Sequence, residues 1–393
     1  MSGVPHYPET WRVLRFGDVV RQVKRKVDPV VAGLERYVAG EHMDTDDLRI
    51  RRWGNVGDGY LGPAFTAHFL PGEVLYGSRR TYLRKVAVAD FEGVCANTTF
   101  VLEPSTPELL PEYLPYVMST DPFHEHSVKQ SKGSVNPYIN FRDLTWYEFA
   151  LPPLEEQHRI VKVLNAVDEV HEAYLQAQLA AQILVLSLAA RLVPVDKAKA
   201  SGRLGDLCQV QVGFPFPSPD YVETGIRLLR CSNVSVAILT WEEESTRYWP
   251  EDKRHEYSDY ELEVGDVVVA MDRPFVGKGF KISRVSKDDL PALLLQRVGR
   301  LLPKPGVTKD TLWSILRAPS TPRHLKSMQK GTDLPHISRF DIERIPIDMV
   351  AALDRDIHAL IGAAEATVSA TDLVIRSVGV LRKRLLGVLL NVH

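Results

Sequence analysis

The sequence predicts a mixed α+β protein with two tandem α/β domains, each followed by a long helix, and the two helices pair as an antiparallel coiled coil. Three observations predict this fold class: two long stretches with helical apolar spacing, short β-type runs between Gly and Pro, and an internal repeat. The expected boundaries are 1–150 for the first domain, 151–194 for the first helix, 195–346 for the second domain and 347–393 for the second helix.

The composition is that of a globular protein. With 393 residues, of which 45% are hydrophobic and 25% charged, the chain suits two domains. Its three cysteines form no C-x-x-C pair, which argues against a disulfide framework or zinc knuckle and fits a reducing cytosol. We expect a cytoplasmic protein, because neither a signal peptide nor an apolar run of ~18–20 residues is seen. The net charge of −2 argues against a histone-like coat but not against a specific DNA reader.

The first long helix is expected directly after Pro152 and Pro153, because proline can occupy the first turn of a helix but not its interior. No Gly or Pro follows until Pro194. Apolar residues recur at gaps of three and four, which predicts one buried stripe. This stripe contains Ile160, Val163, Val167, Val170, Tyr174, Ala177, Ala181, Leu184 and Leu188.

The second long helix is expected after Pro346, over residues 350–390. Each helix would be roughly 55–60 Å long, and long helices with narrow apolar stripes usually pair as coiled coils. Two separate helices, each lying on its own domain, are the alternative. The second stripe contains Ile357, Ile361, Ala364, Val368, Thr371, Ile375, Val378, Leu385 and Leu389.

Short β-type runs, bounded by Gly or Pro, fill much of the remaining sequence. Examples are residues 72–78, 98–104, 265–271 and 277–283. This texture is typical of mixed α+β domains with short strands.

The two halves of the chain repeat each other in the same order. Residues 14–20 resemble 203–209, 70–80 resemble 263–273, and 129–144 resemble 327–342. The offset between matched residues drifts only from 188 (Gly17 to Gly205) to 198 (Lys132 to Lys330). A period this long indicates duplication of a whole domain rather than a solenoid repeat of ~20–50 residues.

Residues 151–170, LPPLEEQHRIVKVLNAVDEV, resemble the signature that follows each target-recognition domain in type I restriction-modification specificity subunits. The runs LPGEVL at 70–75 and SKGSVNPYI at 131–139 are also similar to that family. The resemblance covers essentially the whole chain. One departure is IPIDMV at 345–350, where the family has a proline pair and Glu-Gln.

The resemblance implies a non-catalytic protein that reads a bipartite double-stranded DNA target, one half with each domain. The paired helices would fix the spacing and dock two DNA methyltransferase (modification) subunits, and a restriction/translocase subunit would join them. Glu156, Gln157 and Ile160 are the implied partner contacts. Because of the departure at 345–350, equal docking sites in the two halves are not implied. No cofactor, metal or membrane contact is implied.

DNA contacts are expected from loop side chains, because arginine reads guanine, asparagine and glutamine read adenine, and glycine lets the backbone approach a phosphate. The first half offers Ser78, Arg79, Arg80, Arg84, Lys129, Ser131 and Lys132. The second offers Asp272, Arg273, Lys278, Gln329, Lys330 and Thr332. The alternative is solvated turns with ordinary surface charge. The aromatic residues Tyr82, Tyr138 and Phe275 are expected to pack in the core rather than touch thymine methyl groups.

Catalytic and metal-binding patterns are weak. Residues 136–138, Asn-Pro-Tyr, match only part of the N-P-P-Y/F motif of amino-methyltransferases, and no Gly-rich cofactor loop precedes them. The cluster of His42, Asp44, Asp46 and Asp47 is typical of a solvated or capping loop rather than a metal site. Two rival functions remain: a methyltransferase or nuclease that acts alone, and a DNA-binding adaptor of another phage-defence complex.

Overall fold

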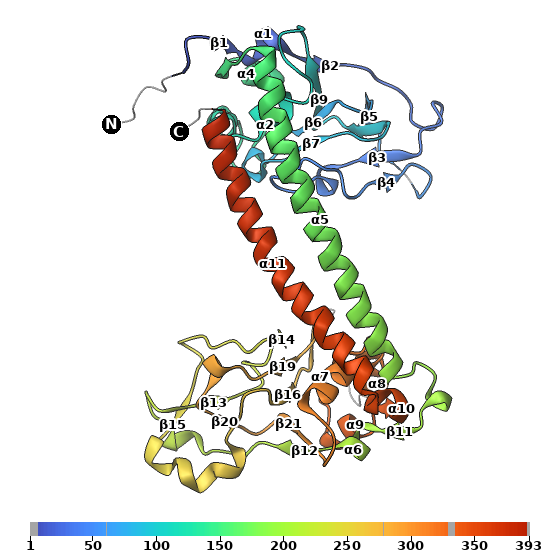
Figure 1. The fold of residues 1–393 in the computed structure, drawn as a ribbon, viewed down its shortest axis with the longest axis vertical. Coiled ribbons are helices and arrows are strands. Elements are labelled where there is room, and N and C mark those ends of the chain that lie inside the picture. Colours follow the sequence, from blue (N-terminus) through green and yellow to red (C-terminus); the bar gives the residue numbers. More distant parts are fainter. Residues whose placement is uncertain (1–6, 60, 278, 329–334, 391–393) are drawn as a thin grey trace. The chain divides into compact units, whose positions relative to one another are not determined.

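A computed structural model describes residues 7–59, 61–277, 279–328 and 335–390. The chain forms two compact units. Unit 1 comprises residues 1–174 and 373–393, and unit 2 comprises residues 175–372. Each unit contains a β-rich domain and parts of both long helices (Figure 1). The predicted α+β class, with a long helix after each β-rich domain, is confirmed.

Unit 1 contains two four-stranded sheets and a two-stranded pair. The central sheet is antiparallel, in the order β2-β9-β6-β7, and the second sheet has the order β4-β3-β8-β5, in which β3 and β8 are parallel. The strands are β1 Arg12–Arg15, β2 Val20–Val23, β3 Arg36–Val38, β4 Gly54–Asn55, β5 Phe65–Phe69, β6 Val74–Gly77, β7 Val86–Val88, β8 Gly93–Ala96, β9 Thr99–Pro104 and β10 Glu148–Leu151.

Unit 2 repeats this arrangement. Its central sheet has the order β12-β21-β16-β19-β14 and its second sheet the order β15-β13-β20. The pair β11-β22 corresponds to β1-β10 of unit 1, and unit 2 adds a second two-stranded pair, β17-β18. As in unit 1, one pair in the second sheet is parallel, here β13 with β20. The strands are β11 Gly202–Arg203, β12 Cys208–Val212, β13 Ile226–Leu229, β14 Val236–Ala237, β15 Tyr248–Trp249, β16 Val267–Ala270, β17 Phe275–Val276, β18 Gly279–Phe280, β19 Ile282–Arg284, β20 Ala292–Leu294, β21 Val298–Pro303 and β22 Pro346–Ile347.

Short helices complete each domain. The α-helices are α1 Phe16–Val19, α2 Leu114–Met118, α3 Asp121–Lys129 and α4 Phe141–Leu144 in unit 1, and α6 Leu204–Leu207, α7 Lys309–Arg317, α8 Thr321–Met328 and α9 Arg339–Glu343 in unit 2. The 3₁₀ turns are η1 Gly40–His42, η2 Thr81–Leu83, η3 Lys197–Lys199, η4 Ser218–Asp220, η5 Glu251–Tyr260 and η6 Lys287–Asp289.

The sequence repeat is therefore a repeat of structure. At the start of α1 the backbone N–H of Arg15 donates to Asp18 at 3.0 Å, and at the start of α6 the N–H of Arg203 donates to Asp206 at 2.8 Å. The central strands also correspond, because β2, β9, β6 and β7 occupy the places of β12, β21, β16 and β19.

Both faces of the central sheets are buried. On β6, Val74 and Tyr76 belong to one apolar cluster and Leu75 between them to another. On β16, Val267 and Val268 are divided in the same way. Successive side chains of a strand point to opposite faces, so a strand buried on both sides needs a continuous apolar run. This requirement explains the uninterrupted VLY and VVVA sequences.

The first long helix, α5 (Leu154–Leu192), agrees with the prediction, but the second is interrupted. The chain forms α10 (Met349–Leu353) and then α11 (Arg355–Leu389), where one continuous helix was predicted. Between them Asp354 has extended φ and ψ angles, and its carboxylate accepts from the N–H of Asp356 at 2.9 Å. Asp354 therefore caps the start of α11, which satisfies N–H groups that have no partner within the helix.

The long helices pack against each other in both units, as predicted, and they run antiparallel. In unit 1 the Nε of Arg382 donates to Asp168 at 2.6 Å. In unit 2 Gln178 donates to the carbonyl of Val368 at 3.4 Å, and Leu188 shares a buried cluster with Ile361. Along α5 the contacting residues are 168, 178 and 188, and their partners on α11 are 382, 368 and 361. The helices are antiparallel because one series rises while the other falls.

The predicted stripe on α5 is only partly correct. Ile160 and Leu188 are buried, but Val163, Val170 and Leu184 are 39%, 46% and 44% exposed. The side chains buried instead include Leu164, Val185 and Leu192. The helix is apolar on more than one face, so spacing alone did not distinguish the packed stripe from the open one.

Candidate nucleic-acid interface

In unit 1 the segment that follows strand β6, residues 78–80, pairs with the loop of residues 132–139. We name these two segments together corner 1. Arg79 forms a β-bridge with Tyr138, and the N–H of Arg80 donates to the carbonyl of Pro137 at 2.6 Å. Lys132 and Tyr138 exchange two backbone hydrogen bonds of 2.7 and 2.9 Å, which close the second loop. The corner brings together two segments that are far apart in the sequence.

Unit 2 has the same arrangement after strand β16, and we name residues 271–273 and 335–337 corner 2. Asp272 forms a β-bridge with His336, and the N–H of Arg273 donates to the carbonyl of Pro335 at 2.9 Å. The bridge and this hydrogen bond correspond to those between Arg79 and Tyr138 and between Arg80 and Pro137 in corner 1. Corner 1 and corner 2 are thus equivalent places in a duplicated fold, each following the corresponding strand, β6 or β16, of its central sheet.

Both corners contain an arginine in the left-handed region of backbone space. Arg80 has a φ of +51° and Arg273 a φ of +45°, and both residues are exposed. Such a conformation is uncommon outside glycine and costs of order 1 kcal/mol or more, so it persists only where neighbouring contacts enforce it. The hydrogen bonds to the two proline carbonyls are such contacts.

The predicted DNA contacts of unit 1 differ in accessibility. Arg79, Arg80 and Lys129 are exposed, and Arg80 donates to the Asn136 side chain at 2.9 Å. Ser78 is only 5% exposed, and its hydroxyl donates to a backbone carbonyl. Ser78 therefore supports the corner, whereas an accessible loop side chain was expected.

Three other predicted contacts in unit 1 are engaged in contacts within the domain. The hydroxyl of Ser131 donates to the carbonyl of Val128 at 2.7 Å, and the ammonium of Lys132 lies 3.0 Å from Asp143. The hydrogen bond from Lys132 is the main reason why the pKa of Asp143 is below its usual value. Arg84 is half-buried between two carboxylates.

Among the predicted contacts of unit 2, Asp272 and Arg273 lie in corner 2, and Lys278, Gln329, Lys330 and Thr332 lie outside the described residues. The carboxylate of Asp272 accepts from Arg297 at 2.6 Å and from His336 at 2.7 Å. Burial alone would raise the pKa of Asp272, but these two hydrogen bonds hold it below its usual value.

Sequence reasoning missed Arg297 and His336. The repeat held a usable signal for His336, because its neighbour Pro335 was already matched to Pro137. Arg297 gave no such signal, because only the tertiary fold brings it to Asp272.

The aromatic residues near the corners behave differently from expectation in unit 1. Tyr82 and Tyr138 are 54% and 45% exposed, so the prediction that they pack in the core is wrong. Phe275 in unit 2 packs against the buried cluster, as predicted. Tyr138 lies in corner 1, where its backbone pairs with Arg79 and Lys132.

The start of α5 is fixed by a buried glutamine. Gln157 is fully buried, its amide oxygen accepts from the N–H of Leu110 at 2.9 Å, and its amide nitrogen donates to the carbonyls of Glu108 and Pro152 at 2.7 and 2.8 Å. The predicted partner contact is therefore a structural anchor.

The other two predicted partner contacts also divide between interior and surface. Ile160 is 1% exposed and lies in the core of unit 1. Glu156 keeps 28% of its side chain exposed and pairs with Arg159 at 2.6 Å. In unit 2 the carboxylate of Asp348 caps α10 instead, with a hydrogen bond of 3.0 Å from the N–H of Val350. Of the three predicted contacts, only Glu156 presents side-chain surface.

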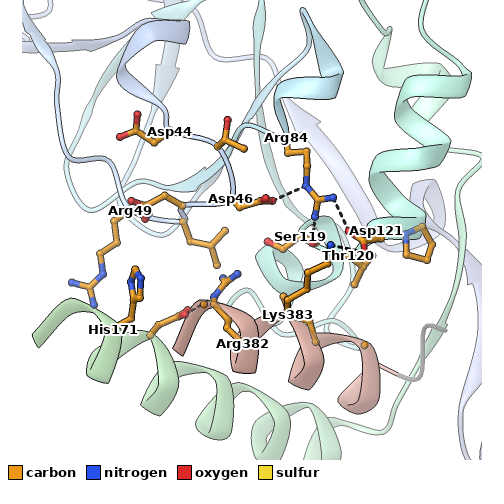
Figure 2. A pocket seen from close by; sticks show the side chains of 18 of the residues that line it. Asp44, Asp46, Arg49, Arg84, Ser119, Thr120, Asp121, His171, Arg382 and Lys383 are labelled. Carbon is orange, nitrogen blue, oxygen red and sulfur yellow. Dashed lines mark hydrogen bonds and ion pairs between the residues drawn. The ribbon is translucent and has the colours of Figure 1, made fainter. Parts of the chain in front are cut away.

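Figure 2 shows a pocket of about 630 Å³ in unit 1, between the loop from Asp44 to Arg51, the start of α3 and the paired helices. The acidic loop that raised the question of a metal site lies here. Its three aspartates pair with arginines: Asp44 with Arg52, Asp46 with Arg84 and Asp47 with Arg51. No group of three or more ligands suited to a metal ion occurs within the described residues.

The pocket has perturbed titrating groups with structural causes. Burial would raise the pKa of Asp121, but hydrogen bonds from Arg84 and Lys383 hold it below its usual value. Burial lowers the pKa of the adjacent His124 to about 4, and neither of its ring nitrogens has a hydrogen-bond partner in the structure. These are features of a charge-paired joint between the domain and the helices of unit 1.

By length and composition alone, α5 could cross a membrane, contrary to the expectation from sequence. In unit 1 it packs against the domain core and α11, and in unit 2 it contributes Leu188 and Leu192 to the largest buried cluster. These contacts cover only part of the helix, because 17% of its most apolar stretch is buried.

Residues 60–184 match the Type I restriction modification DNA specificity domain. The chain is also 25% identical, over 372 residues, to the Type I restriction enzyme MjaVIII specificity subunit of Methanocaldococcus jannaschii, and the match covers 84% of this chain and 80% of that protein.

Two solved structures share the fold. One is a chain from a structure of complex assembly and conformational transition of the type I R-M system, with a TM-score of 0.55, 19% identity and 98% coverage of both chains. The other is the type I restriction-modification S subunit from M. genitalium, with a TM-score of 0.56, 15% identity and 96% coverage of both chains.

Proposed function

From the premise that this chain is a DNA specificity subunit of a type I restriction-modification system, we propose that it reads a bipartite double-stranded DNA target. The domain of residues 1–150 reads one half and the domain of residues 195–346 reads the other. As a specificity subunit the chain is not an enzyme, and the catalysis resides in other subunits of the complex.

The duplicated corner is the observation that carries this proposal. Each corner presents exposed arginine beside a loop pair of the same geometry, and corner 1 adds Arg79. Lys129, at the end of α3, is exposed as well. Arginine donates two parallel hydrogen bonds to guanine in the major groove, and basic side chains also neutralise phosphates. Local basic groups of this kind are compatible with a net charge of −2, because recognition depends on the charge at the contact surface.

The long helices would hold the two domains at a fixed spacing. At 1.5 Å per residue, the 39 residues of α5 span about 58 Å. Half-sites read from one side of a duplex lie about one helical turn apart, or ~34 Å, so paired helices of this length are long enough for the task. With a flexible linker, the second domain would have a lower effective concentration at its half-site once the first domain is bound, because effective concentration falls as a linker becomes longer than the span it bridges.

The same helices would dock two modification subunits, and a restriction/translocase subunit would join that assembly. An apolar groove on the helices of unit 1 supports this proposal. Its lining comes from both helices: Val163, Ala166, Val167, Val170, Val378 and Leu381. An amphipathic partner helix could bury this groove, since apolar grooves bind helices through residues spaced three and four apart.

A cytoplasmic location is part of the proposal, because a subunit that reads DNA must share a compartment with it. The three cysteines are unpaired, which is compatible with a reducing compartment.

Spacer length is the direct test. Methylome sequencing of the host identifies the modified bipartite motif, and the chain is then bound, with its modification partner, to duplexes with the spacer changed by one base pair. We expect at least a tenfold loss of affinity for each altered spacer. Equal affinity for all spacers would contradict a rigid two-domain reader, and a free chain that methylates DNA unaided would favour the rival enzyme function.

A further inference from the structure

We propose that Arg297 and His336, held in place by Asp272, are the base-reading side chains of unit 2 and recognise a G·C base pair in the major groove. The inference rests on the proposed function and deepens it by naming the base pair and the residues.

The three side chains are arranged with the carboxylate inside and the donors outside. The side chain of Asp272 is 29% exposed, and its two oxygens accept from Arg297 at 2.6 Å and His336 at 2.7 Å. The side chains of Arg297 and His336 are 67% and 52% exposed. Asp272 is therefore a positioning residue, and the two donors form the accessible surface.

The backbone holds Arg297 in a conformation that few arginines adopt. Its φ is +67°, and its carbonyl accepts from the N–H of Met271 at 2.9 Å and from the thiol of Cys231 at 2.7 Å. Arg273 of corner 2, which follows Asp272 in the chain, is left-handed as well, with a φ of +45°. Non-glycine residues in this region are costly, and such strain is concentrated at functional sites.

The donor geometry favours guanine. One Nη of Arg297 donates to Asp272, and no other side-chain bond of Arg297 is found among the described residues. A guanidinium held by a carboxylate keeps a second edge with two parallel donors, which matches the O6 and N7 acceptors of guanine. An accessible aspartate would instead accept from cytosine, but both oxygens of Asp272 are already engaged.

Corner 1 uses the same framework with different chemistry. The carbonyl of Thr98 accepts from the N–H of Ser78 at 2.9 Å, as the carbonyl of Arg297 accepts from Met271. Arg79 and Tyr138 occupy the places of Asp272 and His336. The trio of Asp272, Arg297 and His336 is thus specific to unit 2.

The competing interpretation is an ordinary surface ion pair. Exposed ion pairs contribute little to stability, and their removal leaves DNA discrimination unchanged. The two interpretations therefore differ in base-pair discrimination, which a purely structural role would not alter.

The test uses the full chain in complex with its modification subunits and the target identified by methylome sequencing. A photo-crosslinker at position 273 first identifies the half-site bound by unit 2. Affinities for duplexes with each base pair of both half-sites exchanged are then measured for the wild type, R297Q, R297K, H336Q and D272N. R254Q is the matched control, because Arg254 is another ion-paired surface arginine of unit 2.

We expect R297Q to bind the intact target roughly 10- to 100-fold more weakly and to lose discrimination at one G·C pair of the unit 2 half-site. R297K keeps the charge, so it retains part of the affinity but loses the same discrimination. H336Q and D272N lose part of the discrimination at this G·C pair. All variants discriminate base pairs in the other half-site as the wild type does.

The inference is overturned if the unit 2 half-site contains no G·C pair, or if R297K and R297Q discriminate like the wild type. If an R79A/R80A variant still alters discrimination in that case, the proposed function survives and only this assignment fails. If neither corner affects DNA binding, the proposed function itself fails. Should R297Q not fold, R297K and H336Q decide the question.

Discussion

Replacing Gln157 with leucine should destabilise unit 1 by about 3 kcal/mol. The buried amide of Gln157 is the partner of one N–H and two carbonyls, at Leu110, Glu108 and Pro152. Leucine has a similar volume, so the cavity term is small. Each backbone group that loses its partner costs roughly 1–3 kcal/mol, and only the Pro152 bond is wholly buried, so we take about 1 kcal/mol for each of the three.

Urea unfolding combined with amide hydrogen exchange measures this effect. The two units need not unfold together, so exchange must be resolved for each unit. We expect faster exchange of the Leu110 N–H and an earlier transition in unit 1, with unit 2 unchanged. Q178L is the matched control, because the Gln178 amide makes one long hydrogen bond of 3.4 Å. A loss below about 1 kcal/mol would refute the anchoring role of Gln157.

Three further predictions concern unit 1. Because burial lowers the folded-state pKa of His124 to about 4, while the unfolded value is near 6.5, the unfolded chain binds the extra proton between these pH values. The stability due to neutral His124 is therefore complete above pH 6.5 and falls by about 1.4 kcal/mol for each pH unit between 6.5 and 4. Urea unfolding at several pH values should show a smaller pH dependence for H124L than for the wild type. D168A removes the carboxylate that pairs with Arg382, whose side chain is 14% exposed, and should lower the stability of the helix pair by about 2 kcal/mol. D168N should lower the stability by less, and thermal melts of both variants measure the difference. V170E places a charge in the apolar groove, so it should weaken the binding of a modification subunit in a pull-down while DNA binding is unchanged. If V170E captured the modification subunit as well as the wild type does, docking in this groove would be contradicted.

Long-range organisation could be predicted from the sequence because its signals are long and redundant. The proline pair before residue 154 and the absence of helix breakers predicted α5, and ordered matches at a nearly constant offset predicted the duplicated domains. Both signals depend on many residues, so no single misreading could remove them.

Contacts set by tertiary register could not be predicted. The apolar surface of α5 offers two stripes, and packing against the domain and α11 buries Leu164 while Val163 stays exposed. Ser78 was expected at the surface because it follows a strand, but the fold places its hydroxyl on Thr98. Arg297 joins Asp272 across 25 residues of sequence, which no local pattern encodes.

Crosslinking from both corners is the most direct test of whether two equivalent corners read two halves of one target. A photo-crosslinking amino acid replaces Arg79 or Arg273 in the full chain, and the crosslinked nucleotides are mapped on the bipartite duplex. We predict that position 79 reacts only in one half-site and position 273 only in the other. Crosslinks from both positions to the same half-site, or none above those to unrelated DNA, would contradict the account.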